Sequence, residues 1–166
     1  MPEFNLAFSE KLIEAATLIS KNDLTEIESK RTVLYLSLLS CEITIKALLE
    51  KAGITIKKIK SHSHNLSELL KEIGNCEIHK ELSPSCSKWI RATEIRSITI
   101  DSRFSNATAG NLLTAESKGA SVYPNQIRYG DKLTHYPPEV MLEVAKAIVA
   151  WAKAYFEKIR IAQPGA

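Results

Sequence analysis

The chain has 166 residues, of which 45% are hydrophobic and 25% charged, and it carries a net charge of +3. This length and composition predict that residues 1–166 form a single globular domain with a substantial core, and the mild positive charge permits a nucleic-acid partner without requiring one. The amino terminus has no basic region followed by an apolar run, and no window approaches the ~18 apolar residues of a membrane span. We therefore expect a soluble, cytoplasmic protein without a membrane partner.

The three cysteines, Cys41, Cys76 and Cys86, are an odd number and contain no C-x-x-C pair. This pattern argues against a disulfide framework and against a structural zinc site. Cys41 falls on an apolar helical stripe, which favours a small core residue. We expect reduced thiols and no metal or other cofactor.

Helical periodicity dominates the first half of the chain. Phe4, Phe8, Leu12 and Ile19 predict a short first helix that ends before Lys21. From about 25 to 52, apolar residues recur alternately four and three positions apart, which predicts one long central helix. The residues of this stripe are Leu34, Leu38, Cys41, Ile45, Leu48 and Ala52.

The ends of these helices carry recognisable signals. Thr25 with Glu28 three residues later fits a capping box, and Gly53 lies where a left-handed residue would end the central helix. Asn65 then predicts the start of a compact helix. Ser83 followed by Pro84 predicts another, which carries Trp89, Ile90 and Thr93.

The second half of the chain is less regular. Residues 97–100 alternate like a strand but also continue the register of the preceding helix, so both interpretations stay open. Residues from about 101 to 126 have no clear period and predict a long loop, which in a compact domain is typical of a lid, a binding loop or disorder. After Pro137 and Pro138, a stripe of apolar residues predicts a last helix over about 138–160. We expect Trp89 and Trp151 to be core residues rather than platforms for base stacking.

No strand can be assigned securely, and most connections between the predicted helices are short. The expected fold is therefore all-α, an antiparallel bundle of four to five helices with a long loop over about 101–126 before the last helix.

Arg128 and His135, separated by six residues, form the most complete candidate for catalysis. An arginine can hold a phosphate with two hydrogen bonds and a histidine moves protons near neutral pH, so the pair would suffice for RNA cleavage without a metal. The spacing also fits an arginine that pairs with a carboxylate beside an unrelated surface histidine.

Two further groups of residues are candidates for binding. The segment with Lys57, Lys58, Lys60 and His64 could contact phosphate or could be a solvated loop, and a metal site at His62 and His64 is disfavoured because no acidic cluster is nearby. The other group is the pair Glu42 and Lys46, four residues apart on a second stripe of the central helix. This pair could face a site or form a salt bridge at the edge of the core.

Residues 38–53, 64–70 and 127–131, in this order, resemble segments of the HEPN family (higher eukaryotes and prokaryotes nucleotide-binding). The resemblance spans roughly residues 8–160. It implies a helical bundle that often dimerises, and in many members a metal-independent ribonuclease with an Arg-x(4–6)-His motif. Such members are frequently toxins or antiviral effectors, paired with a nucleotidyltransferase-like antitoxin. Carried over to this chain, the motif is Arg128 and His135.

The match departs from that motif in two respects. Tyr129 and Gly130 follow Arg128, and two prolines follow His135, which resembles instead those members that carry Arg-Tyr-Pro without the histidine and bind nucleotides or partners. Two hypotheses remain. In the first, the chain is an endoribonuclease in which Lys57, Lys58, Lys60 or His64 guide the RNA. In the second, it is a non-catalytic module in which a groove lined by Glu42, Lys46, Arg128 and Tyr129 binds a nucleotide or a partner protein. Asp131 in the same segment is a further candidate for substrate binding.

Overall fold

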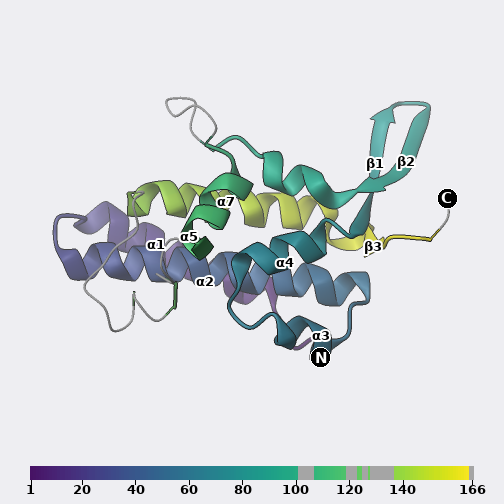
Figure 1. Ribbon diagram of the computed structural model, residues 1–166. Helices are drawn as coiled ribbons and strands as arrows, with labels where there is room; N and C mark the ends of the chain where they lie inside the picture. The colour runs from purple at the N-terminus through teal and green to yellow at the C-terminus, as the bar shows by residue number, and fades with distance from the viewer. Residues whose placement is uncertain (101–106, 119–122, 125–126, 128–136, 165–166) are drawn as a thin grey trace.

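A computed structural model describes residues 1–100, 107–118, 123–124, 127 and 137–164. The fold is mostly helical, with a small antiparallel sheet at one end (Figure 1). The α-helices are α1 (Leu6–Asn22), α2 (Ile27–Ala52), α3 (Ile56–Ser61), α4 (Leu66–Ile73), α5 (Ala109–Lys118) and α7 (Pro138–Tyr155). The remaining elements are the 3-10 helices η1 (Ala92–Ser97) and η3 (Phe156–Lys158) and the strands β1 (Cys76–Ser83), β2 (Cys86–Arg91) and β3 (Ile159–Ile161).

The ends of α2 and α4 test the predicted caps. Gly53 adopts φ 107°, the left-handed conformation expected at the end of α2, and the Asn65 side chain accepts a hydrogen bond from the amide of Glu68 at 3.1 Å, as predicted for α4. The prediction of a capping box at Thr25 is wrong, because the N-cap residue of α2 is Glu26. Its amide and hydroxyl both donate to Oδ1 of Asp23, at 2.7 and 2.6 Å, so its side chain is used in the preceding turn.

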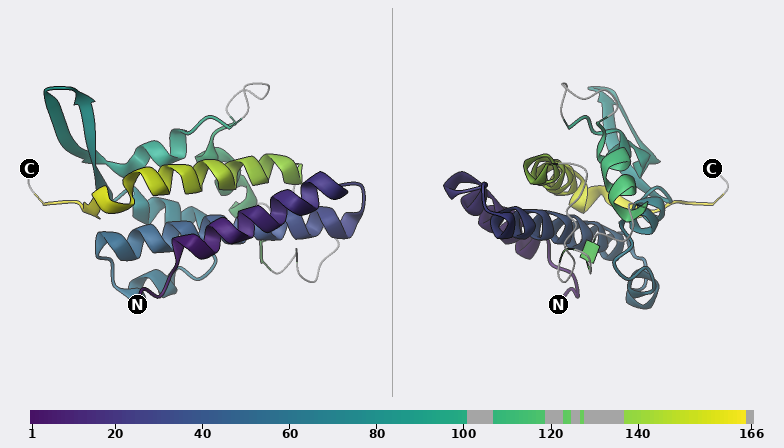
Figure 2. Two further views of the ribbon diagram at one scale, coloured as in Figure 1. Left: turned by 180° about the vertical axis from the view of Figure 1, so that it is seen from behind. Right: turned by 60° about the vertical axis from the view of Figure 1, so that its left-hand side comes forward.

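Helix α1 runs antiparallel to α2, but α7 runs in the same direction as α2 (Figures 1 and 2). Val33 packs with Leu142 where both helices begin, and Lys51 pairs with Glu157 at 2.9 Å where both end. The sequence led us to expect an antiparallel bundle. This expectation is wrong for α2 and α7, which run parallel to one another.

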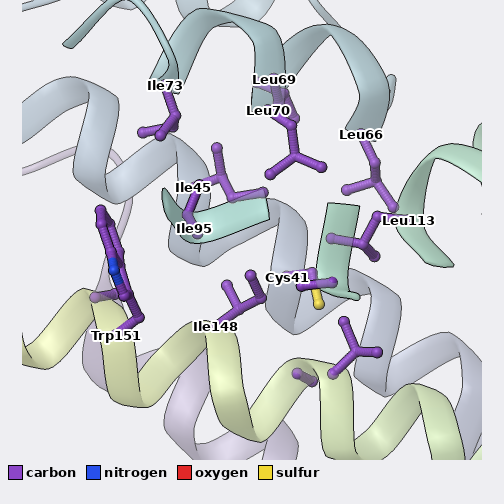
Figure 3. Close-up of a cluster of buried hydrophobic side chains, with 14 of the residues drawn as sticks. Cys41, Ile45, Leu66, Leu69, Leu70, Ile73, Ile95, Leu113, Ile148 and Trp151 are labelled. Carbon is purple, nitrogen blue, oxygen red and sulfur yellow. The ribbon is translucent and has the colours of Figure 1, made fainter. Parts of the chain in front are cut away.

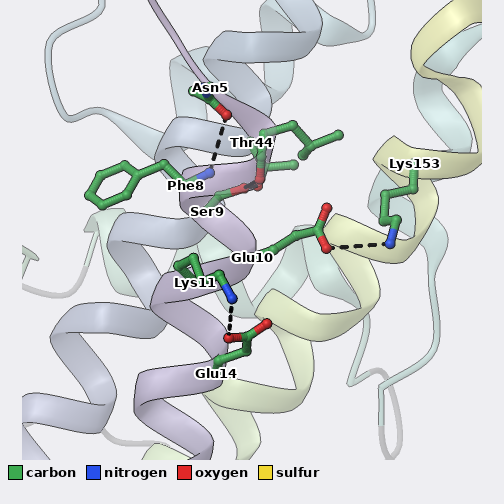
Figure 4. A network of polar contacts seen from close by, with 9 residues as sticks. Asn5, Phe8, Ser9, Glu10, Lys11, Glu14, Thr44 and Lys153 are labelled. Carbon is green, nitrogen blue, oxygen red and sulfur yellow. Dashed lines mark hydrogen bonds and ion pairs between the residues drawn. The ribbon is translucent and has the colours of Figure 1, made fainter.

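Polar contacts join α1 to its neighbours (Figure 4). The hydroxyl of Thr44 in α2 donates to that of Ser9 in α1 at 2.9 Å, and Lys153 in α7 approaches Glu10 at 3.3 Å. A cavity of about 250 Å³ lies between α1 and α7. Its lining residues are Glu10, Ile13, Glu14, Lys146, Val149, Ala150 and Lys153.

The main core lies between α2, α4, α5, α7 and η1 (Figure 3). The predicted stripe of α2 faces it, since every member except the half-buried Ala52 is fully buried. Cys41 and Trp151 are core residues, as predicted. Burial of this apolar area is the main force that holds the helices together.

The region around Ser83 and Pro84 corrects the prediction of an all-helical chain. Instead of opening a helix, Pro84 lies in the two-residue turn of a β-hairpin, and β1 pairs with β2 on one side and with β3 on the other. Proline fits a turn as well as the first turn of a helix, because its φ suits both. Cys76 and Ile78 are both buried and lie two positions apart, which is the period of a β-strand rather than of a helix.

Trp89 is therefore on β2 and is not a core residue, contrary to prediction. Its ring is half-buried, opposite His79 on β1, with their centroids 5.2 Å apart, and the guanidinium carbon of Arg160 lies 3.9 Å from its centroid. This contact is a cation–π interaction.

The predicted long loop over about 101–126 is wrong in part, because α5 occupies residues 109–118. Leu112 and Leu113 bury its apolar side. Thr99 bridges to Thr108, so the alternating residues before the loop do pair as an isolated antiparallel bridge. The last helix ends at Tyr155, and the buried Ile159 belongs to β3 rather than to the predicted helix of 138–160.

By length and composition alone, the 26 residues of α2 could cross a membrane, which the sequence analysis did not anticipate. Of its apolar window, 72% is buried inside the protein. A buried core helix can have the same length and apolar composition as a membrane span. The position of α2 in the core is therefore enough to explain its apolar composition.

Candidate functional site

Four of the predicted site residues lie outside the residues that the structure describes. These are Arg128, Tyr129, Asp131 and His135. Whether Arg128 and His135 face one another therefore stays a prediction. The other predicted residues are all described, and they fall into two groups, one on α2 and one on α3 and the turn that follows it.

Glu42 and Lys46 form the predicted ion pair of α2, with Nζ of Lys46 2.8 Å from Oε1 of Glu42. The pair is not at the edge of the core, since Glu42 is 4% and Lys46 7% exposed. The ring of Phe4, from the segment before α1, covers Lys46, whose Nζ lies 5.5 Å from the ring centroid. Charged groups are buried in this way only when they are paired and hydrogen-bonded.

His64 is the third member of the site, although it is 22 residues from Glu42 in the sequence. Its Nδ1 lies 3.0 Å from each carboxylate oxygen of Glu42. The residue before it, Ser63, has φ 50°, a left-handed conformation that costs a non-glycine residue roughly 1 kcal/mol. The turn between α3 and α4 therefore holds a strained residue directly beside the histidine.

The hydrogen bond to Glu42 fixes the tautomer of the His64 ring. An ionised carboxylate can only accept, so Nδ1 carries the proton and donates it, and in the neutral ring Nε2 keeps its lone pair. The side chain of His64 is 47% exposed. Within the described part of the chain, no group hydrogen-bonds to Nε2. A buried carboxylate thus orients the ring at Nδ1, and nearly half of the side chain is exposed.

Tyr123 completes the group that we call the Glu42 cluster: Glu42, Lys46, His64 and Tyr123. Its hydroxyl donates a short hydrogen bond to Oε2 of Glu42. Its ring lies edge-on to His64, with centroids 6.1 Å apart. Burial, and then the negative charge of Glu42, raise the pKa of Tyr123 above its usual value, so the hydroxyl stays protonated and remains a donor.

A second contact ties the same segment to α2. Nη1 of Arg31 donates to the carbonyl oxygen of Ile127 at 2.7 Å, and the side chain of Ile127 is buried. Helix α2 therefore holds the chain at Tyr123 and at Ile127, the residue directly before Arg128. The predicted arginine follows a point that is fixed to the central helix.

The lysines of the second group are on α3 rather than in a loop. Lys58 pairs with Glu72 at 2.9 Å and Lys60 with Glu3 at 2.6 Å, while Lys57 is exposed. Because two of the three charges are partly balanced by carboxylates, this surface attracts phosphate less strongly than its sequence suggests.

The residues described contain no group of three or more His, Cys, Asp or Glu side chains placed to hold a metal ion. The cavity between α1 and α7 shares no lining residue with the Glu42 cluster. What the Glu42 cluster can do chemically is hold an imidazole in one orientation at the surface, with a nitrogen lone pair available to accept a proton.

The sequence indicated the residues of this cluster only separately. Glu42 and His64 lie in two of the segments that carried the family resemblance, but nothing in the spacing showed that they touch. Tyr123 was missed altogether, because the segment around it has no period that would identify a buried residue.

Comparison of the chain with protein-family models, with curated proteins and with solved structures finds no match.

Proposed function

We propose that this chain is a HEPN-like bundle of four to five helices that acts as a metal-independent endoribonuclease. The observation that carries the proposal is the Glu42 cluster: a buried carboxylate on the central helix orients an open imidazole and anchors the segment that leads to Arg128. A buried ion pair adds little net stability compared with apolar residues of similar size. Departures from good core design of this kind are expected at functional sites.

Metal-free cleavage of RNA needs three catalytic groups. A base removes the proton of the ribose 2′-hydroxyl, an acid protonates the leaving 5′-oxygen, and a cation stabilises the charge that develops on the phosphate. In the proposal, Arg128 is the cation and His135 transfers a proton to the leaving oxygen. In the wider context that the resemblance implies, the chain would work as a homodimeric toxin or defence protein with a nucleotidyltransferase-like antitoxin.

The burial of Glu42 and Lys46 weighs against the alternative of a non-catalytic module. A groove lined by these two residues would need their charged groups to be available to a nucleotide or a partner. They are instead buried and bonded to one another. The binding groove that motivated this alternative thus loses two of its proposed residues.

The test is cleavage by the purified full chain of a panel of labelled single-stranded and hairpin RNAs in excess EDTA. We expect products that end in a 2′,3′-cyclic phosphate, and a loss of about 100-fold or more in rate for both Arg128→Ala and His135→Ala. Matched controls are Arg96→Ala and His79→Ala, which remove an exposed arginine and a histidine of the hairpin.

Two outcomes would overturn the proposal. The first is intact RNA with the wild-type protein, and the second is unchanged cleavage by folded His135→Ala. Intact RNA together with thermal stabilisation by a nucleotide would support the binding module instead.

A further inference from the structure

We infer that His64 is a catalytic residue of this site, a general base that acts through Nε2 on the 2′-hydroxyl of RNA, and that Glu42 is its positioning residue. The inference rests on the proposed function and deepens it, because the sequence had suggested only a guiding role for His64. The observations that support it concern described residues alone.

The orientation of the His64 ring suits a general base. Nδ1 is 3.0 Å from both oxygens of Glu42, and the carboxylate itself is held by Lys46 and by the Tyr123 hydroxyl. A carboxylate that binds one ring nitrogen fixes both the tautomer and the direction of the other nitrogen, which is how a histidine base is made ready. Edge-on contact with Tyr123 limits rotation of the same ring.

Neither charge balance nor core packing requires His64. Lys46 already compensates the charge of Glu42 inside the protein, so His64 is not needed as a counter-ion. Nor does His64 fill space in the core, since nearly half of its side chain is exposed. A histidine that served only the fold would be expected to bury its ring or to use both nitrogens.

The reaction step balances without any other reactant. Nε2 of His64 takes the proton of the 2′-hydroxyl while the 2′-oxygen bonds to phosphorus, and the bond from phosphorus to the 5′-oxygen breaks. The leaving 5′-oxygen takes a proton from an acid, the role that the proposed function gives to His135. The products are a 2′,3′-cyclic phosphate and a 5′-hydroxyl, and the two histidines have exchanged protonation states until water restores them.

The decisive variant is His64→Asn. The Asn amide can reach Glu42 much as Nδ1 does and so preserves the support of the fold, but it has nothing in place of Nε2. The matched control is His62→Asn, two residues away. Rates are measured under single-turnover conditions in EDTA between pH 5 and 9, together with binding of a 2′-O-methyl RNA of the same sequence.

We expect His64→Asn to bind this RNA within about threefold of wild type while its cleavage rate falls by ~10²–10⁴-fold, the range typical of a lost general base. The rise of the rate with pH on the acidic side of the profile should also disappear. His62→Asn should cleave within about threefold of wild type. If His64→Asn folds poorly, His64→Gln under the same conditions carries the same expectation.

Each other result overturns a defined part of the account. No cleavage by wild type removes the proposed function, and the role of His64 with it. Cleavage by folded His64→Asn or His64→Gln within about threefold of wild type, with the acidic side of the profile unchanged, removes the role of His64 and leaves the proposed function standing. A loss of binding equal to the loss of rate makes His64 a guide for RNA rather than its base.

Discussion

Two histidines, His62 and His64, lie two residues apart and each approaches a buried glutamate, yet the two pairs are built differently. His64 places Nδ1 3.0 Å from both oxygens of Glu42, and its side chain is 47% exposed. His62 has its Nε2 3.6 Å from Glu72, too far for a hydrogen bond, and its side chain is 16% exposed. Among the described residues, this buried Nε2 has no hydrogen-bond partner.

The partners of the two carboxylates differ as well. Glu42 binds a buried lysine and a tyrosine hydroxyl in addition to the histidine, whereas Glu72 binds Lys58, whose side chain is 55% exposed. A histidine close to a carboxylate is therefore not enough to indicate a site. Two features distinguish the Glu42 cluster. Its carboxylate contacts a lysine and a tyrosine hydroxyl as well as Nδ1 of His64, and the His64 side chain is nearly half exposed. The following predictions test this difference.

The largest effect is expected from removal of each carboxylate. Glu42→Ala leaves the Lys46 ammonium buried without its acceptor and should cost about 3–5 kcal/mol of unfolding free energy. Glu72→Ala should cost about 1 kcal/mol, because water can solvate Lys58. Urea denaturation of both variants measures the difference. Equal losses would show that the two pairs are energetically alike.

The lysines give the next effect. Lys46→Met keeps the aliphatic stem but leaves Glu42 buried without its lysine partner, and should cost about 2 kcal/mol. Lys58→Met should cost less than about 1 kcal/mol, because the side chain of Lys58 is 55% exposed although its partner Glu72 is buried. Urea denaturation measures both variants. An equal loss of unfolding free energy for Lys58→Met and Lys46→Met would show that burial does not distinguish the two ion pairs.

Tyr123 adds a dependence on pH that only the Glu42 cluster has. Its pKa is raised in the folded state, so the stability linked to it is fully present below the ordinary tyrosine value of about 10 and is lost as pH rises above that value. Between pH 9 and 11 wild type should lose up to about 1 kcal/mol more than Tyr123→Phe. Parallel curves for the two proteins would show that the hydroxyl is not held by Glu42.

The smallest effect concerns the thiols beside the two carboxylates. Cys41 precedes Glu42, and Sγ of Cys76 is 3.8 Å from the Glu72 carbonyl oxygen. Burial raises the pKa of Cys41 to about 12 and that of Cys76 to about 11. In a Cys86→Ser background, a thiol reagent should therefore label Cys76 faster than Cys41. Faster labelling of Cys41 would mean that the surroundings of Glu42 open more readily than those of Glu72.

Much of the helical framework could be predicted from the sequence. The stripe of α2, the glycine that ends it and the Asn65 cap depend on residues within a few positions of one another, and local patterns report such features well. The hairpin was missed because Ser83 and Pro84 suit a turn and a helix start equally. Only the pairing of β1 with β2 and with the distant β3 distinguishes a turn from a helix start at these residues.

The candidate site was harder to predict for the same reason. The Glu42–Lys46 contact follows from a spacing of four on a helix and was predicted, but its burial was not. That burial depends on Phe4 and Tyr123, which reach α2 from far along the chain. The meeting of His64 with Glu42 depends on the turn after α3, where Ser63 adopts a conformation that no residue type in that stretch would indicate.

The most direct test of the central claim observes both histidines in one sample. Long-range proton–nitrogen NMR spectra of the ¹⁵N-labelled wild type report the tautomer of each imidazole, with assignments taken from His62→Asn and His64→Asn. We predict that His64 has its proton on Nδ1, and that addition of a 2′-O-methyl RNA shifts its Nε2 signal while that of His62 stays in place. A proton on Nε2 of His64, or an Nε2 signal that the RNA leaves unmoved, would contradict it.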